Sequence, residues 1–229
     1  MTAIRYVDLA DARPDEAVVV IDVLRAFTVE PWLFHRGAAR LLAVDTLDGA
    51  VALRDEYLPH ALLAGEQGGA PVAGFDLGNS PSEVAGQDLT DATVVHRTSA
   101  GTQGLARTIG SGLVLAASFV TAAATARRLR SAAPARISFV ITGASLGRDG
   151  DEDLAAAELI AARVLGHDPD PVPFLDRVPV SDAGRYFGPG GPDWAPEADL
   201  RLSLEVDRFD HTLVATPSKE LDAVEIALG

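Results

Sequence analysis

The segment Val-Val-Val-Ile-Asp-Val-Leu-Arg-Ala-Phe-Thr (18–28) decides how this chain folds. Its first four residues are all β-branched and form an apolar run without polar alternation, which is typical of a strand buried on both faces of a sheet. Asp22 follows the run, and Thr28 opens a stretch long enough for a helix. A second run of this kind, Ile-Ser-Phe-Val-Ile (137–141), predicts another central strand. Both runs fit the parallel strands of an α/β protein.

The chain on either side repeats this alternation of strand and helix. Strands are predicted at residues 17–21, 41–44, 61–64, 93–95, 113–117 and 137–142. Helices are predicted at residues 28–36, 47–58, 101–109, 119–129 and 152–165. Alternation of this kind builds βαβ units, so we expect a three-layer α/β/α fold with a mostly parallel sheet.

The later part of the chain is less regular. Gly and Pro predict loops at 166–173 and 188–196, and further strands are expected at 200–206 and 213–215. We expect two similar α/β subdomains, with residues 1–130 in the first and 131–229 in the second.

Composition excludes several classes of function. The chain has 229 residues, with 19 basic and 33 acidic side chains and a net charge of −14, so it has no general attraction to nucleic acid or anionic lipid. Cysteine is absent, which excludes disulfides and thiolate chemistry. No apolar run reaches the roughly 18–20 residues of a membrane helix, and the first residues do not resemble a signal peptide. We therefore expect a cytoplasmic protein.

Polar side chains follow four of the predicted strands, where open α/β sheets bind their ligands. Asp22 and Arg25 suit a metal ion beside an anion, although Asp22 can equally cap a helix. Haloacid-dehalogenase phosphatases need a second aspartate at the position of Leu24, so that family is rejected. Glu66, in a segment with five glycines (64–83), can join Asp22 on Mg²⁺; an ordered surface loop is the alternative.

The third and fourth strand ends are also polar. The segment His-Arg-Thr-Ser-Ala-Gly-Thr (96–102) places hydroxyl and glycine residues at a helix start, which outlines an anion site. His96 is either an acid–base group or a structural side chain, and Arg97 is a ligand contact if it points into the crevice. Glu152 and Asp153 suit the first turn of a helix, where the dipole favours acids. A metal role for them follows only if the four loops converge.

Several short motifs together resemble the 2-phosphosulfolactate phosphatase family. They are Asp-Val-Leu-Arg-Ala (22–26), Gly-Glu-Gln-Gly-Gly (65–69), Gly-Phe-Asp-Leu-Gly-Asn-Ser-Pro (74–81), Gly-Thr (101–102), Ser-Phe (118–119) and Glu-Asp (152–153), with a looser similarity at 197–200 and 206–207. The octapeptide 74–81 is the most specific of them. The resemblance implies an α/β enzyme that uses Mg²⁺ to remove phosphate from 2-phosphosulfolactate on the route to coenzyme M, and it makes a homodimer plausible.

The resemblance also implies roles for individual residues. The metal ligands expected from it are Asp22, Glu66, Glu152 and Asp153. Arg25 is expected to bind the charge that develops during hydrolysis, while Asp22 is either a metal ligand or a nucleophile. The expected substrate contacts are Asn79, Ser80, Arg97, Thr98, Ser99, Gly101, Thr102 and Ser118.

Among the positions that depart from the family's usual residues, three bear on the substrate. Gln67 and Gln103 stand where the family has arginine, and Ala100 stands where it has asparagine. Each lost bidentate arginine contact typically costs about 1.5–3 kcal/mol. These losses predict an altered substrate. The alternative is a catalytically inactive member of the family that binds a small anion or a protein partner.

Overall fold

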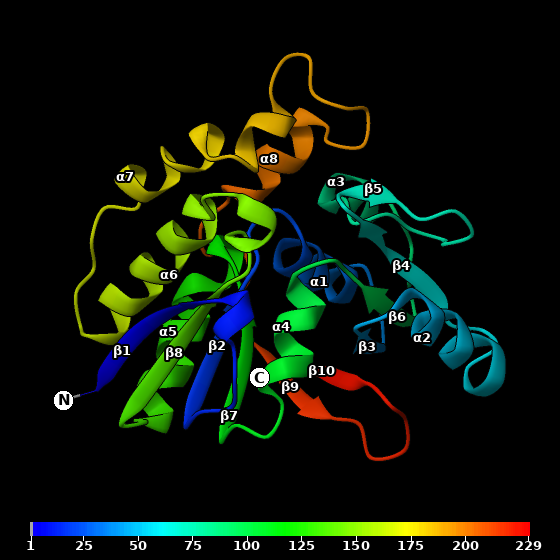
Figure 1. Ribbon diagram of the computed structural model, residues 1–229, viewed down its shortest axis with the longest axis horizontal. Helices are drawn as coiled ribbons and strands as arrows, with labels where there is room; N and C mark the ends of the chain where they lie inside the picture. The colour runs from blue at the N-terminus through cyan, green and yellow to red at the C-terminus, as the bar shows by residue number, and fades with distance from the viewer. Residues whose placement is uncertain (1) are drawn as a thin grey trace.

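The computed structural model describes residues 2–229, apart from the side chain of Leu146. Its strands form one sheet in the order β1-β8-β2-β7-β9-β10-β3-β6-β4-β5 (Figure 1). The strands are β1 (Ala3–Asp8), β2 (Ala17–Ile21), β3 (Arg40–Val44), β4 (Leu62–Gln67), β5 (Ala70–Pro71), β6 (Thr93–Arg97), β7 (Leu113–Ala117), β8 (Arg136–Ile141), β9 (Leu213–Pro217) and β10 (Val224–Leu228). The α-helices are α1 (Ala26–His35), α2 (Leu47–Ala52), α3 (Pro81–Ala85), α4 (Gly101–Thr108), α5 (Ala122–Ala132), α6 (Asp151–Val164), α7 (Val172–Leu175) and α8 (Glu197–Ser203).

The sheet consists of two parallel halves joined by an antiparallel hairpin. In the first half β2 pairs in parallel with both β7 and β8, and β1 pairs with β8. In the second half β6 pairs in parallel with β3 and β4. The hairpin of β9 and β10 lies between them, because β9 pairs with β7 and β10 pairs with β3, both antiparallel. The expected α/β fold with a mostly parallel sheet is confirmed.

The two halves do not follow a division of the chain after residue 130. Strand β8 comes after that point in sequence, yet it lies between β1 and β2 in the sheet. The hairpin that ends the chain likewise lies between the halves rather than in a separate unit. The strand order therefore gives no grouping into 1–130 and 131–229.

Side chains of successive strand residues enter different cores, because they point to opposite faces of the sheet. Val18 and Val20 belong to a core shared with α1 and α4, which extends across both halves to Leu41 and Ala43 of β3. On the opposite face, the alternate residues of β2 pack with α5 and α6. In the second half, the alternate residues of β3 pack with α2. These helices on both faces make the three layers.

Most sequence predictions of helices and strands are confirmed. All six predicted early strands are present, and so is the strand expected at 213–215. The predicted helix at 119–129 starts with a 3₁₀ turn (Phe119–Thr121), and the one at 47–58 ends in a π turn (Leu53–Tyr57). The two loops hold largely, although α7 begins within 166–173. The sequence did not predict β1, the two-residue strand β5 or β10. Strand β1 lies at the sheet edge and is largely exposed, so it carries no apolar run.

The strand predicted at 200–206 is wrong, because residues 197–203 form helix α8. Contacts spaced four residues apart stabilise this helix. Glu197 pairs with Arg201 at 2.9 Å, and the Ser203 hydroxyl donates to the Asp199 carbonyl at 2.9 Å. The alternating leucines therefore did not indicate a strand here.

Within residues 2–229, no helix combines the length and the apolar character that crossing a membrane requires. Figure 1 shows α7 and α8, in yellow and orange, at the same end of the molecule as α3 and β5. Loops from both halves of the sheet reach this end, and the candidate site lies among them.

Candidate active site

A cavity of about 260 Å³ lies where the carboxyl ends of parallel strands meet. The loop after β2 contributes Asp22, the end of β4 contributes Glu66, and the loop after β6 contributes Ser99. The loop after β8 and the first turn of α6 supply the opposite wall. The side chains that line this pocket and could bind a ligand are Asp22, Arg25, Glu66, Asn79, Ser99, Thr142, Arg148, Glu152, Asp153, Tyr186 and Trp194.

Asp22 lines this pocket and is buried. Its Oδ1 accepts a hydrogen bond from the Ala26 amide at 3.0 Å, so the carboxylate also caps helix α1. The pKa of Asp22 is raised to about 6, chiefly by burial and also by the nearby Glu66 and Glu152 carboxylates, while the Ala26 hydrogen bond and Arg148 oppose the shift. Asp22 is thus both a capping residue and a destabilised carboxylate facing a cavity.

Gly101 allows helix α4 to start directly against Asp22. A Cβ atom at residue 101 would lie 2.8 Å from Asp22 Oδ2 and 2.8 Å from the Ala26 side chain. Any larger residue would push the start of α4 away from the carboxylate. Gly101 therefore shapes the site without offering a side chain to a ligand.

Glu66 holds two loops together. Its Oε2 accepts a hydrogen bond from the Gly69 amide at 2.5 Å, and its Oε1 accepts one from the Ser99 amide. The Ser99 hydroxyl in turn accepts a hydrogen bond from the Gly68 amide at 2.9 Å. The glycine-rich loop and the loop after β6 are therefore fixed on one carboxylate at the pocket wall.

Asp153 plays the same part on the other side. Its Oδ1 accepts from the Val23 amide at 2.7 Å, and its Oδ2 accepts from the Gly143 amide at 2.7 Å and the Thr142 hydroxyl at 3.1 Å. Burial, together with the Glu152 and Asp22 charges, raises the pKa of Asp153 well above its ordinary value. Asp153 thus joins the loops that follow β2 and β8.

Glu152 is the carboxylate with most unused capacity. It is buried, and its Oε2 has no hydrogen-bond partner among the described residues. Burial raises the pKa of Glu152. A buried oxygen without a partner is costly unless a ligand, an ion or a proton satisfies it.

The four expected metal ligands thus meet at one pocket, but they are not equivalent. Within the described residues, no three acidic or histidine side chains are grouped closely enough to hold a metal ion by themselves. Glu66 and Asp153 are already bonded to backbone amides. Asp22 and Glu152 keep oxygens that could accept a cation. Two carboxylates fit Mg²⁺, which usually takes one or two from the protein and completes its shell with water and phosphate.

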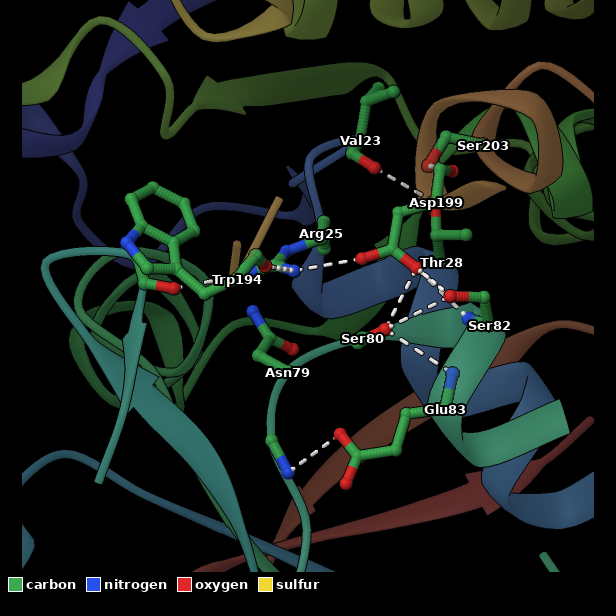
Figure 2. A network of polar contacts seen from close by, with 12 residues as sticks. Val23, Arg25, Thr28, Asn79, Ser80, Ser82, Glu83, Trp194, Asp199 and Ser203 are labelled. Atoms are coloured by element: carbon green, nitrogen blue, oxygen red, sulfur yellow. Dashed lines mark hydrogen bonds and ion pairs between the residues drawn. The ribbon is translucent and has the colours of Figure 1, made fainter. Parts of the chain in front are cut away.

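Arg25 is held by the protein on several sides (Figure 2). One guanidinium nitrogen donates to Asp199 Oδ2 at 2.8 Å and to the Trp194 carbonyl at 2.6 Å, and the other donates to the Gly69 carbonyl at 2.9 Å. Its guanidinium carbon lies 5.4 Å from the ring centre of Phe187 and 5.6 Å from that of Trp194. Arg25 therefore joins the C-terminal segment to the glycine-rich loop.

Asp199 completes this connection from helix α8. Its Oδ1 accepts from the Ser80 hydroxyl at 2.8 Å and from the amide and hydroxyl of Ser82 at 3.0 and 2.5 Å (Figure 2). The Asp199 side chain is fully buried. We call Arg25 and Asp199, with their partners Ser80 and Ser82, the Arg25–Asp199 clamp.

Arg148 is the pocket cation least engaged by the protein. Its hydrogen bonds to the carbonyl and hydroxyl of Ser145 measure 3.4 and 3.5 Å, at the limit of such contacts. It is half-buried and lowers the pKa values of Asp22 and Glu152 by its charge. The guanidinium is therefore free to bind an anion beside these two carboxylates.

Some of the expected substrate contacts line the pocket and others lie behind it. Asn79 and Ser99 line it. Arg97 donates to the Glu66 carbonyl at 2.8 Å, so it supports the end of β4. Thr98 and Thr102 bond to each other, Ser80 caps helix α3, and Ser118 donates to the Phe27 carbonyl.

The three departures from the family pattern also differ in position. Ala100 lines the pocket. Gln67 is exposed and Gln103 donates to the Asp45 carbonyl, and neither belongs to the pocket wall. Only one of the three substitutions therefore changes a surface that a ligand would touch.

Sequence reasoning missed Arg148, Asp199 and the aromatic wall formed by Tyr186, Phe187 and Trp194. Arg148 lies between Gly147 and Gly150 in the loop after the strand predicted at 137–142, and a basic residue at that place was a usable signal. Asp199 was expected only as part of a loose similarity, and the three aromatic residues carry no local pattern. Asp199 and the three aromatic residues join the site because the C-terminal segment folds back over it, whereas Arg148 reaches it from the loop between β8 and α6.

Comparison with known proteins gives consistent results. A family model described as 2-phosphosulpholactate phosphatase matches residues 5–183. A "Probable 2-phosphosulfolactate phosphatase" of Deinococcus radiodurans is 42% identical over 158 residues, 69% of this chain and 65% of that protein. Proteins of the same name from Bacillus subtilis and Thermus thermophilus are 37% identical over 155 residues and 38% over 177. These cover 67% and 76% of this chain, and 66% and 68% of the relatives.

The match to this chain spans just under two thirds of the first two relatives. The matched family region contains Asp22, Glu66, Arg148 and Asp153 but ends before Asp199. The Arg25–Asp199 clamp therefore connects the matched region to a segment outside it.

Proposed function

The chain belongs to the 2-phosphosulfolactate phosphatase family, and from this premise we propose that it hydrolyses the phosphate monoester of a small acid. One observation carries the proposal. Two buried carboxylates with unused oxygens, Asp22 and Glu152, lie beside the weakly bonded guanidinium of Arg148 in one cavity. Such a pocket offers room for a cation and for the phosphate that the cation would accompany.

Mg²⁺ is the cation that best suits these residues. Asp22 and Glu152 would hold it, and when bound it would polarise a phosphoryl oxygen and help ionise a water molecule. Burial and, after it, repulsion between the crowded carboxylates raise the pKa values of Asp22 and Asp153, and a divalent cation would relieve the repulsion. Glu66 and Asp153 position the surrounding loops.

The remaining steps belong to the chain's own residues. Arg148 binds the phosphoryl oxygens and offsets the charge that develops on them. Ser99 and Asn79 border the same space and can donate hydrogen bonds to the substrate. Asp22 is either a ligand of the cation or the nucleophile that attacks phosphorus, because a free oxygen on a carboxylate suits both roles.

The substrate we propose is 2-phosphosulfolactate or a close analogue with an altered acidic group. Ala100 supports the alteration, because it puts a methyl group on the pocket wall where the family usually has an amide. Gln67 and Gln103 do not add to this argument, since neither lines the pocket. Trp194 and Tyr186 add an aromatic wall that favours a substrate with a non-polar portion.

A second candidate is a family member that binds a small anion without hydrolysing it. The arrangement of Arg25 favours it, because three hydrogen bonds to the protein occupy the guanidinium expected to act in catalysis. Binding without turnover would identify this second function.

Phosphate release from 2-phosphosulfolactate, phospholactate and other small monoesters tests the proposal, with Mg²⁺ and with EDTA. We expect turnover that needs Mg²⁺. Asp22→Asn should abolish it, and Arg148→Gln should lower kcat/KM by about 100-fold, the usual size for one preorganised charge contact. Arg127→Gln, at an exposed position, is the matched control. Wild-type rates in Asp22→Asn would exclude the mechanism, and no turnover from folded protein would favour the binding function.

A further inference from the structure

A buried chain of polar side chains runs from the core to the pocket. His96 of β6 is completely buried, and its Nδ1 lies 3.1 Å from Oε1 of Glu30 in helix α1. Its Nε2 lies 3.2 Å from Oδ1 of Asn79. Of these three residues only Asn79 lines the cavity.

The position of the protons on Glu30 and His96 follows from one atom that has no hydrogen-bond partner. Oε2 of Glu30 is buried and has no hydrogen-bond partner among the described residues. A fully ionised carboxylate in that situation would lose solvation without compensation, and burial raises the pKa of Glu30 accordingly. A proton on Oε1 of Glu30, donated to Nδ1 of His96 or shared with it, would remove this uncompensated charge.

With its Nδ1 facing that proton, His96 carries its other hydrogen on Nε2. This hydrogen is donated to Oδ1 of Asn79. The amide is then fixed with its NH₂ group directed away from His96. Figure 2 shows the Asn79 side chain near Arg25 and Trp194, and all three residues line the same cavity.

We propose that Glu30 and His96 are positioning residues that hold the NH₂ group of Asn79 toward the pocket, where it donates a hydrogen bond to an anionic oxygen of the substrate. This inference rests on the proposed function for the identity of the anion. It assigns His96 no acid–base step, because its ring lies behind Asn79 and does not line the cavity. The reverse orientation would present the amide oxygen instead and repel a phosphate.

Nitrogen NMR on the wild-type chain tests the orientation without any turnover. The chain has five histidines, and the ¹⁵N signals of His96 are assigned by their loss in His96→Gln. We expect a protonated Nε2, retained in Glu30→Gln because the new amide can donate to Nδ1. An unprotonated Nε2 beside a protonated Nδ1 would overturn the inference, because His96 would then accept from the amide of Asn79.

Binding of inorganic phosphate tests the consequence. We expect Asn79→Ala and His96→Leu each to raise the dissociation constant by about tenfold, the size of one charge-assisted hydrogen bond. The double variant should bind like Asn79→Ala alone, because His96 acts only through Asn79. A double variant in which the two fold-changes multiply would contradict the proposal, and so would an unchanged affinity in Asn79→Ala. A wild-type protein that does not bind phosphate would contradict it as well.

These measurements separate the inference from the proposed function. If phosphate binding depends on Asn79 and His96 as described but no ester is hydrolysed, the positioning role is supported and the phosphatase activity is excluded. A chain that hydrolyses an ester while Nε2 of His96 is unprotonated keeps the phosphatase and loses the positioning role.

Discussion

At the scale of single residues, carboxylates of similar burial do different work. The carboxylate oxygens of Asp153 and Glu66 accept hydrogen bonds from backbone amides and thereby fix loops. One oxygen of Asp22 accepts a hydrogen bond from the first amide of helix α1, and one oxygen of Glu152 has no partner among the described residues. The unfavourable charge is therefore concentrated where a cation or substrate would bind, and this costs stability in the free protein.

The pH dependence of stability should reveal this cost at Asp22. Its pKa in the folded chain is about 6, above its ordinary 3.8, so the folded state binds more protons between these values. Stability from this group is full below about pH 4 and is lost as pH rises through 6. In EDTA, the free energy of unfolding of Asp22→Asn should rise relative to that of wild type by up to about 3 kcal/mol as the pH increases from 4 to 7.5.

Urea unfolding at several pH values measures this difference. Asp168→Asn, at a highly exposed carboxylate, is the control and should run parallel to wild type. Parallel profiles for Asp22→Asn as well would contradict the assigned shift. Saturating Mg²⁺ should stabilise wild type at pH 7.5 and should have a weaker effect on the variant, because one ligand is lost.

At the scale of elements, helix α8 matters more for the site than its seven residues suggest. It supplies Asp199, which bonds to α3 through Ser80 and Ser82 and to Arg25 after β2. Gly69 lets the glycine-rich loop pack directly on Trp194, since a Cβ there would lie 2.6 Å from the ring. The C-terminal segment is thus fastened over the pocket by charge and by close packing.

Removing Asp199 should release this segment. Asp199→Ala leaves the buried Arg25 guanidinium without its counter-ion, which typically costs about 3–5 kcal/mol. Urea unfolding measures the loss, and Trp194 fluorescence reports the segment. The control is Glu197→Gln, two residues before Asp199 in an exposed pair with Arg201, which should cost less than about 1 kcal/mol. Equal stability of the two variants would show that the clamp contributes little.

At the scale of the whole molecule, the hairpin of β9 and β10 joins the parallel halves. Backbone hydrogen bonds run from β7 through the hairpin to β3. The core beneath α1 and α4 also contains residues of both halves, among them Val20, Leu41 and Ile226. Separate unfolding of one half would therefore expose a shared core and break a continuous sheet.

The chain should accordingly unfold in one cooperative step. Far-UV circular dichroism and the fluorescence of Trp32 and Trp194 should give coincident transitions in urea. Ile226→Ala, which truncates a buried hairpin side chain, should shift both probes together by about 2–5 kcal/mol. Two separate transitions in the wild type would disprove a single cooperative unit.

The sequence by itself determined the layered α/β fold and the early strands and helices, together with the strand ends that carry Asp22 and Glu66 and the helix start that carries Asp153. These features depend on local patterns: an apolar run, a helical period, or a polar residue after a strand. The strand predicted at 200–206 failed because its alternating apolar residues begin inside α8, where Leu200 and Leu202 fit a helix as well as a strand. Short segments contain too little pattern to separate the two.

Only the tertiary structure decided what each charged side chain does. Arg25 and Arg148 both follow predicted strands, yet distant carbonyls and Asp199 occupy the first, while the second keeps its donors for the pocket. His96 became part of a buried chain because Glu30 and Asn79 come from other elements. A side chain's role depends on its partners, and those partners lie up to 174 residues away along the chain.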